Sequence, residues 1–304
     1  MGVDEGYRSG FLTLVGRPNA GKSSLINAVL GKKMAITSDT VQTTRHRLRA
    51  VVSRPGFQLI MVDTPGLHKP QDLLGEALNT TAYKALDGVD VVALVVDASK
   101  DVGTGDEWVA QRLKQAAAKK IAVLSKTDLV SEDVLLRQAQ AVAQLADWDA
   151  TVSLSALKGE GIDPFLDTVV AFLPFGPKWF PEDVQTDQPI EVIVAEFIRE
   201  KVLKGFFDEV PHAIGVATEE MAYDRKKDLY RIEAHIFVER ESQKGMIIGK
   251  GGSSIKNIGT LARIDLEQLL GCKVFLELKV KVKKNWRRDA NQIRRFGYGE
   301  GFEL

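Results

Sequence analysis

A glycine-rich segment near the start of the chain has the residues of a phosphate-binding loop. Residues 16–23 read GRPNAGKS and fit the spacing G-x-x-x-x-G-K-S/T, directly after an apolar run and before a helical one. Glycines let the backbone wrap a phosphate chain with its N–H groups inward, and the positive end of the following helix attracts the same anion. We expect Lys22 to bridge the β- and γ-phosphates of a nucleotide and the Ser23 hydroxyl to bind Mg²⁺.

An acid at the end of a strand and a polar segment before that strand supply the rest of such a site. Asp63 ends the apolar run FQLIMVD and can hold the magnesium shell, and Gly66 offers a backbone N–H to a γ-phosphate. A threonine of the polar run TSDTVQTTRHR, Thr43 or Thr44, can complete the shell when a γ-phosphate is present. We assign Thr44, with an ordinary surface loop as the alternative. The predicted phosphate-binding residues are Gly16, Asn19, Ala20, Gly21, Lys22, Ser23, Ser24 and Gly66, and the predicted magnesium ligands are Ser23, Thr44 and Asp63.

A second motif, S-K-T-D at residues 125–128, has a carboxylate that can read a base. Asp128 can accept hydrogen bonds from N1–H and N2–H₂ of guanine, which adenine does not offer, and an acceptor left unpaired penalises the wrong base. The stem of Lys126 can lie along the flat ring. The later segment VSLSALKGEG offers backbone groups to guanine O6. The predicted guanine-binding residues are Ser125, Lys126, Asp128, Ser155, Ala156 and Leu157.

The elements that must position these residues alternate between short apolar runs and longer amphipathic ones. We expect strands at residues 11–16, 57–63, 89–97, 119–126 and 150–156, and helices at 22–30, 76–86, 106–119 and 132–146. This alternation predicts an α/β fold with a doubly wound, mostly parallel sheet. Four prolines between residues 174 and 189 indicate a linker, so we place the first domain at residues 1–185 and the second at 186–304.

The second part of the chain predicts a smaller α+β domain that binds nucleic acid. A helix around 198–210 precedes two strands, 212–222 and 229–239, joined by a polar turn; a short helix, a glycine loop, a longer helix and the strand 273–282 follow. Residues 244–295 contain 13 basic and 4 acidic residues, a net charge of +9. A run of charged residues usually forms a solvated face. Because this run includes the glycine loop at 249–252, it favours a nucleic-acid surface. Trp286, inside the basic tail, is assigned equally to packing and to RNA.

The first half, with its motifs in this order, resembles the translation-factor-related GTPases. The resemblance implies hydrolysis of GTP to GDP and phosphate with Mg²⁺. Leu67 stands where signalling GTPases have a water-positioning glutamine, so no catalytic side-chain base is identified and a slow intrinsic rate is expected. In related GTPases, an asparagine at the position of Asn19 is found together with a potassium ion that aids hydrolysis. One residue departs from the family pattern. The base-reading motif of the family begins with Asn, whereas this chain has Ser125 there, and a serine hydroxyl has less reach.

The second half resembles a KH domain in its bacterial form, with a helix-turn glycine cluster as the alternative. The loop of such a domain lets a backbone of about four nucleotides pass between two helices. A phosphate-loop GTPase followed by one KH domain resembles the Era family of bacterial ribosome-assembly GTPases, and the match covers nearly the whole chain, including QTTRHR, DTPGLH and VKVKKNW. The predicted RNA-binding residues are Gly249, Lys250, Gly251, Gly252, Lys256, Lys283 and Lys284.

This resemblance implies a GTP-driven switch that binds small-subunit ribosomal RNA near its 3′ end and assists assembly of the small ribosomal subunit. It also implies peripheral contact with the cytoplasmic face of the inner membrane. The sequence itself favours a cytoplasmic protein, since it has one cysteine, no apolar run of membrane-spanning length and no signal-peptide pattern. We expect a monomer.

Two other functions compete with a GTPase switch. An ATP-using phosphotransferase would leave Asp128 unexplained, and ATP would then displace the bound nucleotide. An RNA-binding protein with a vestigial nucleotide domain conflicts with the intact Gly21-Lys22-Ser23 and Asp63, and measurable turnover would exclude it.

Overall fold

The computed structural model describes residues 6–38, 43–66, 72–206 and 213–298 of the chain. Its contacts divide it into two compact units, the first made of Met1–Ala35, Thr44–Pro70 and Leu78–Asp187 and the second of Ile36–Thr43, Gln71–Ala77 and Gln188–Leu304. Each unit has its own sheet. Within the described residues, no helix is long and apolar enough to cross a membrane.

The first unit is built on a six-stranded sheet in the order β2-β3-β1-β4-β5-β6. Its strands are β1 (Arg8–Val15), β2 (Leu48–Arg54), β3 (Phe57–Asp63), β4 (Val91–Asp97), β5 (Lys119–Ser125) and β6 (Ala150–Ser153). All neighbouring pairs are parallel except β2 with β3, which is antiparallel. The predicted doubly wound, mostly parallel sheet is therefore confirmed. Because β1, β3, β4 and β5 run the same way, the residues that follow them gather at one edge.

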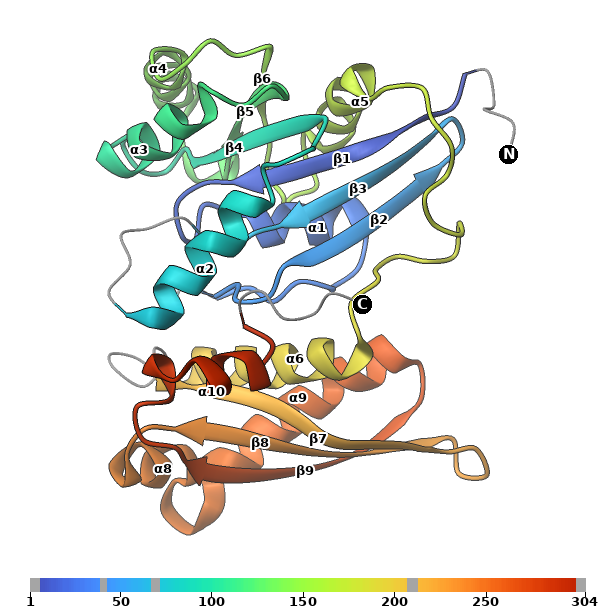
Figure 1. Cartoon of the computed structure of the whole chain (residues 1–304), viewed down its shortest axis with the longest axis vertical. Helices are drawn as coiled ribbons and strands as arrows, with labels where there is room; N and C mark the ends of the chain where they lie inside the picture. Colours follow the sequence, from blue (N-terminus) through green and yellow to red (C-terminus); the bar gives the residue numbers. More distant parts are fainter. Residues whose placement is uncertain (1–5, 39–42, 67–71, 207–212, 299–304) are drawn as a thin grey trace. The chain divides into compact units, whose positions relative to one another are not determined.

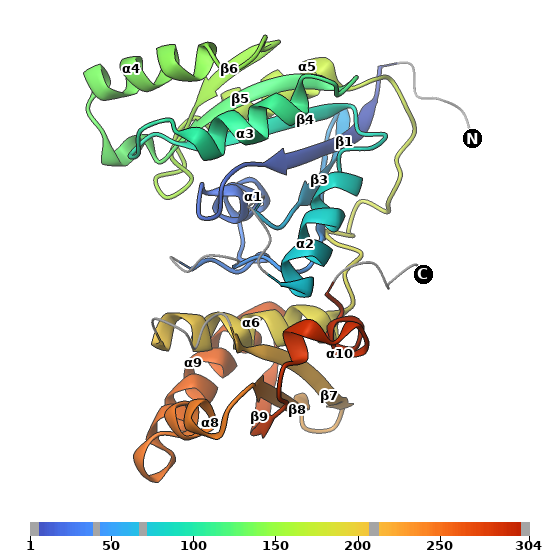
Figure 2. The ribbon, with the colours of Figure 1, turned by 60° about the vertical axis from the view of Figure 1, so that its left-hand side comes forward.

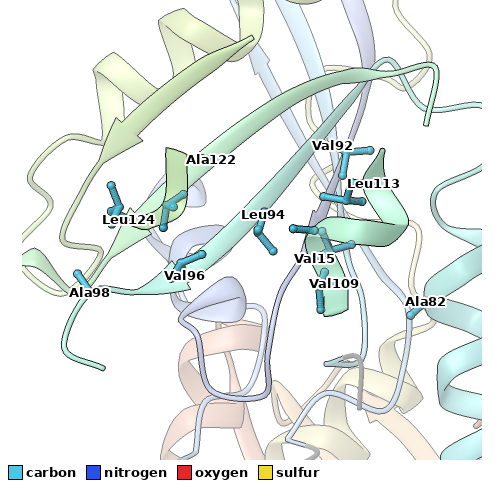
Figure 3. Close-up of a cluster of buried hydrophobic side chains, with 12 residues drawn as sticks. Val15, Ala82, Val92, Leu94, Val96, Ala98, Val109, Leu113, Ala122 and Leu124 are labelled. Atoms are coloured by element: carbon cyan, nitrogen blue, oxygen red, sulfur yellow. The ribbon is translucent and has the colours of Figure 1, made fainter. Parts of the chain in front are cut away.

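Helices cover both faces of this sheet (Figure 1). They are α1 (Lys22–Leu30), α2 (Leu73–Lys84), α3 (Thr104–Leu113), α4 (Glu132–Ala143) and α5 (Ile162–Phe172), with a short 3₁₀ turn η1 (Thr127–Leu129) after β5. On one face, β4 packs against α3 in an apolar cluster whose buried residues are at most 1% exposed. The cluster includes Val92, Leu94 and Val96 of β4 and Val109 and Leu113 of α3 (Figure 3). Burial on both faces explains why β4 is a continuous apolar run rather than an alternating one.

The proline-rich segment predicted as a linker is fixed along the first unit. The Gln58 side chain, in β3, accepts hydrogen bonds from the backbone N–H groups of Trp179 at 2.7 Å and Phe180 at 2.9 Å. Val51 N donates to the Gln185 carbonyl oxygen at 2.8 Å, at the edge strand β2. The division between the units falls after Asp187, close to the sequence-based boundary at 185, which stays a prediction.

The second unit has a three-stranded sheet, β7 (Gly215–Asp224), β8 (Leu229–Val238) and β9 (Lys273–Val282), in the order β7-β8-β9. β7 and β8 are antiparallel, whereas β8 and β9 are parallel. The other elements are α6 (Ile190–Gly205), α8 (Glu241–Ile248), the 3₁₀ turn η2 (Lys250–Gly252), α9 (Ser253–Leu270), the 3₁₀ turn η3 (Trp286–Arg288) and α10 (Ala290–Arg295). Figure 2 shows α8 leading into the loop from which α9 returns. This order confirms the α+β unit expected from the sequence.

An aromatic cluster anchors the chain's last helix to this sheet. Trp286 is fully buried and donates from Nε1 to the Ala213 carbonyl oxygen at 2.8 Å. Its ring lies 5.0 Å from that of Phe296 and 6.0 Å from that of Tyr298, and Phe296 lies 4.7 Å from Phe237 of β8. Of the two roles that the sequence left open for Trp286, the structure shows packing.

Candidate nucleotide site and candidate RNA groove

The phosphate loop joins β1 to α1 through three residues with positive φ. Gly16 has φ 149°, Asn19 has φ 63° and Gly21 has φ 99°, which glycine adopts freely and asparagine more readily than most residues. A Cβ at Gly16 would also collide with the Val95 carbonyl oxygen. The loop therefore needs the residue types that its motif specifies, and its backbone leads directly into the N-terminus of α1.

Lys22 begins α1 and bends back over the loop. Its side chain is buried, and Nζ donates to the carbonyl oxygens of Gly16 at 3.2 Å and Arg17 at 3.0 Å. Burial lowers the pKa of Lys22 to about 8, although the nearby Asp63 carboxylate opposes this shift. Phosphate oxygens are stronger acceptors for an ammonium group than carbonyls, so an incoming phosphate chain would take over these bonds.

The three predicted magnesium ligands lie together beside the loop. Ser23 Oγ donates to Asp63 Oδ2 at 2.8 Å and lies 3.0 Å from Thr44 Oγ1, which is itself 3.3 Å from Asp63 Oδ2. The other carboxylate oxygen, Oδ1, is buried and has no hydrogen-bond partner among the described residues. Burial raises the pKa of Asp63, against the opposing effects of Lys22 and the two hydroxyls. Two hydroxyls and an unsatisfied carboxylate oxygen fit Mg²⁺, which prefers oxygen ligands.

Gly66 lies against the loop, as expected for a γ-phosphate contact. A Cβ there would be 2.9 Å from Pro18 Cα, so any larger residue would push the end of β3 away from the loop. Ser24 and Ala20 lie on either side of the Gly21–Ser23 turn, in the first turn of α1 and in the loop itself. Leu67 lies outside the described residues, and its place in the site stays a prediction.

Ser125 connects the base-reading motif to the phosphate loop. It is 2% exposed, and its Oγ is 2.5 Å from the Ala20 carbonyl oxygen and 3.0 Å from that of Val96. Lys126 follows with φ 58°, and its Nζ contacts Asp97 Oδ2 at 2.6 Å. Burial alone would raise the pKa of Asp97, but hydrogen bonds from Lys126 and Ser99 hold it below its ordinary value. The sequence analysis missed Asp97, although an acid that ends a parallel strand was the signal that identified Asp63.

The two predicted guanine-reading segments meet at Asp128. Ser155 is fully buried, and its Oγ donates to Asp128 Oδ1 at 2.5 Å while it accepts from Lys158 N at 3.1 Å. This bond orients the carboxylate. Ala156 is half-buried, and Leu157 is 83% exposed, which leaves the backbone of this turn accessible to a base.

A further ion pair holds the phosphate loop to α3. Arg17 Nη1 lies 3.1 Å from Asp106 Oδ2, and the same oxygen accepts from Gly103 N at 3.1 Å, at the N-terminus of the helix. The Arg17 stem packs so closely on Gly105 that a Cβ there would lie 3.1 Å from Arg17 Cδ. This contact was not predicted from the sequence. The signal for it was Asp106, an acidic residue in the first turn of a helix.

Two residues of the polar segment before Thr44, Thr37 and Thr43, bond to α6 of the second unit. Thr37 N donates to Glu200 Oε1 at 2.9 Å, and Arg199 Nη2 donates to the Thr43 carbonyl oxygen. Glu200 and Arg199, both on α6, are fully buried. The next residue along the chain is the predicted magnesium ligand.

The glycine loop of the second unit has the backbone of a close-approach site. Gly249, Gly251 and Gly252 have φ 72°, 59° and 80°, conformations that favour glycine. A Cβ at Gly249 would lie 2.7 Å from Ser254 Cβ, whereas one at Gly251 or Gly252 would meet nothing within 4 Å. Lys250 is exposed between them. The outer side of this loop is therefore open to a phosphate backbone.

A groove lies between α9 and β9. It has a volume of about 420 Å³ and is lined by Ile255, Lys256, Gly259, Thr260 and Arg263 of α9 and by Leu276, Glu277 and Leu278 of β9. Of the predicted RNA-binding lysines, Lys256 lies in this lining. Lys283 and Lys284 come after the end of β9, and Lys283 Nζ donates to Oε1 of Gln292, in α10, at 2.9 Å. The structure does not bring these two lysines into the groove.

Comparisons with known proteins agree with this geometry. The family model of the 50S ribosome-binding GTPases matches residues 11–126, and that of the KH domain matches residues 209–287. A structure of Era in complex with MgGDPNP and nucleotides 1506–1542 of 16S ribosomal RNA is 36% identical, covers 96% of this chain and 99% of its own, and has a TM-score of 0.93. A variant of Aquifex aeolicus Era bound to GDP·AlF₄⁻ has the same identity and coverage, with a TM-score of 0.92. The chain therefore belongs to the Era family, as a GTPase domain followed by a KH domain.

Proposed function

We propose that this GTPase binds the 3′ end of small-subunit ribosomal RNA through its KH domain and assists assembly of the small ribosomal subunit. The observation that carries the proposal is the groove between α9 and β9, together with the open glycine loop that precedes α9. Its cationic side chains suit phosphates and its apolar floor suits unstacked bases. The related Era structure contains nucleotides 1506–1542 of 16S ribosomal RNA.

In this proposal Ser23, Thr44 and Asp63 hold Mg²⁺ with the nucleotide phosphates. The ion would neutralise charge on the β- and γ-phosphates when bound. Lys22 binds the same phosphates, the loop N–H groups surround them, and Asp128 selects guanine. The related Era structure contains MgGDPNP, which supports both the nucleotide and the ion.

Potassium is proposed as a further aid to hydrolysis, through Asn19. Asn19 lies within the phosphate loop and has a left-handed backbone, φ 63°, which asparagine adopts more readily than most residues. Turnover should be higher in KCl than in NaCl, and both rates should stay below a typical enzymatic turnover of about 10 s⁻¹. Steady-state release of phosphate in the two salts checks this, and equal rates, unchanged in Asn19→Ala, would contradict the potassium site.

We also propose that the protein acts as a cytoplasmic monomer, with the inner membrane surface as a second place of action. Sedimentation of the pure protein and its distribution between soluble and membrane fractions of cells test these two points separately.

The RNA proposal is tested by titrating an oligonucleotide that copies nucleotides 1506–1542 of 16S ribosomal RNA. The double variant Lys250→Asp, Gly251→Asp places two carboxylates where phosphates would pass, and it should lose binding but keep GTP hydrolysis. Lys250→Asn, Gly251→Asn is the matched control, since Asn makes the same demand on the left-handed backbone without the charge. Equal loss in both variants would point to a damaged loop, and no loss in either would place the RNA elsewhere.

A further inference from the structure

Lys126 has a backbone conformation that its residue type does not favour. Apart from glycines, four of the described residues have positive φ, and the other three are Asn19, Asp228 and Asn285. Asparagine and aspartate tolerate this left-handed region, whereas a lysine there is uncommon. Unfavourable backbone conformations of this kind concentrate at binding sites, where neighbouring groups hold them in place. The contacts of Lys126 therefore indicate what its side chain is held for.

The ammonium group of Lys126 is held by Asp97, on the neighbouring strand. Asp97 ends β4 and pairs in register with Ser125, the last residue of β5, and Ala98 N donates to the Ser125 carbonyl oxygen at 3.0 Å. Nζ of Lys126 lies 2.6 Å from Asp97 Oδ2. The Asp97 side chain is 9% exposed and that of Lys126 is 32% exposed, so solvent screens this pair less than it screens a fully exposed one.

Asp97 is itself fixed from the other side. Its second carboxylate oxygen, Oδ1, accepts hydrogen bonds from Ser99 Oγ at 2.6 Å and from Ser99 N at 3.0 Å. The residues before and after it, Val96 and Ala98, belong to the apolar cluster that packs β4 against α3, with exposed fractions of 1% and 0% (Figure 3). The turn after β4 thus occupies one carboxylate oxygen and leaves the other for Lys126, so the carboxylate has little freedom to rotate.

We propose that Asp97 is a positioning residue for the base of the nucleotide, because it fixes Lys126 with its stem along the purine ring. This inference rests on the proposed guanine-binding role of residues 125–128. A lysine side chain loses rotamer entropy when a ligand orders it, so a site that orders it beforehand binds the ligand more tightly. The Asp97 carboxylate bonds to Lys126 and Ser99 and to no predicted phosphate-binding residue that the structure describes. It therefore acts on the affinity for the nucleotide and leaves the chemistry at the phosphates unchanged.

The test compares the affinity for GDP, measured by calorimetry, with the rate of GTP hydrolysis at saturation. Asp97→Asn keeps an oxygen for Ser99 but turns an amide toward the ammonium group, so it should weaken GDP binding about fivefold or more. The saturating rate should stay within about twofold, because no group at the phosphates has changed. Asp149→Asn is the matched control, since it removes the charge that pairs with Lys119 at 2.7 Å, at the opposite end of β5. It should leave the GDP affinity unchanged.

Lys126→Met, which keeps an unbranched apolar stem without the charge, completes a double-mutant cycle. It should weaken GDP binding as Asp97→Asn does, and the double variant should be no weaker, because the carboxylate acts through the ammonium group. Unchanged or tighter GDP binding in Asp97→Asn, a matching fall in its saturating rate, or additive losses in the double variant would overturn the inference alone. Lys126→Ala removes the stem as well, and unchanged GDP binding in that variant would overturn the guanine-binding role of Lys126 and this inference with it.

Discussion

At the scale of single residues, the selection of guanine depends on one carboxylate. Asp128 is oriented by the buried Ser155 hydroxyl and can accept from N1–H and N2–H₂ of guanine. Asp128→Asn exchanges an acceptor for a donor that suits the 2-keto group of xanthine, so the variant should bind XTP in preference to GTP. Competition of XTP and GTP against a fluorescent nucleotide measures this, and a retained preference for GTP would show that Asp128 does not read the base.

Lys22 should take up a proton when a nucleotide binds. Burial lowers its pKa to about 8 in the nucleotide-free protein, so above that pH a growing fraction of its side chains is neutral. Phosphate oxygens favour the charged form and raise the pKa. Binding of GDP at about pH 8.5 should therefore be accompanied by proton uptake, and binding near pH 7 by almost none. Calorimetry in two buffers of different ionisation enthalpy measures the uptake; identical apparent enthalpies at the higher pH would contradict the shifted pKa.

At the scale of elements, α3 positions the phosphate loop through the pair of Arg17 and Asp106. The Arg17 side chain is 42% exposed, so the pair is screened and its effect is modest. Arg17→Ala and Asp106→Asn should each weaken GDP affinity by about two- to fivefold, and the double variant should be no weaker than the worse single one. Additive losses would mean that the two residues act independently, with Asp106 serving only the N-terminus of α3.

The same scale shows how far the sequence could predict the fold. The run KSSLINAVL forms α1 over its whole predicted length. Its start could be predicted because the phosphate-loop motif ends where the helix begins. Two strands or helices of the first unit were absent from the prediction, β2 and α5. β2 follows a polar segment and contains three polar residues, and it is a strand because Ala50 and Val51 pair with Met61 and Ile60 of β3. α5 has Pro164 in its first turn, where a proline removes no intrahelical bond, so the helix forms in spite of it.

The predicted site residues come from short motifs, for a physical reason. Phosphate, magnesium and guanine each require a residue type at a short, fixed spacing, and the structure shows hydrogen bonds from Ser23 to Asp63 and from Ser155 to Asp128. Long-range partners such as Asp97 and Asp106 are joined to the site only by tertiary structure. Lys283 and Lys284 stay predicted RNA-binding residues outside the lining of the groove, and their charge does not specify which face of a fold they occupy.

At the scale of the whole molecule, the account depends on the segment that ends at Thr44. Residues 36–43 belong to the second unit, where Glu200 accepts from Thr37 N, whereas Thr44 contacts Ser23 and Asp63 in the first. A γ-phosphate that binds with Mg²⁺ at Thr44 therefore acts on a segment in which Thr37 and Thr43 bond to α6. A switch of this kind works only if the two nucleotide states differ in their affinity for RNA.

The most direct test is the RNA affinity of the full chain with a non-hydrolysable GTP analogue and with GDP, measured by filter binding at one salt concentration. The account predicts tighter binding with the analogue, by about fivefold or more. Glu200→Gln, which keeps the shape but loses the charge, should narrow this ratio while GTP hydrolysis persists. Equal affinities in the two nucleotide states would contradict the central claim, and would leave a GTPase and an RNA-binding domain that share a chain without controlling each other.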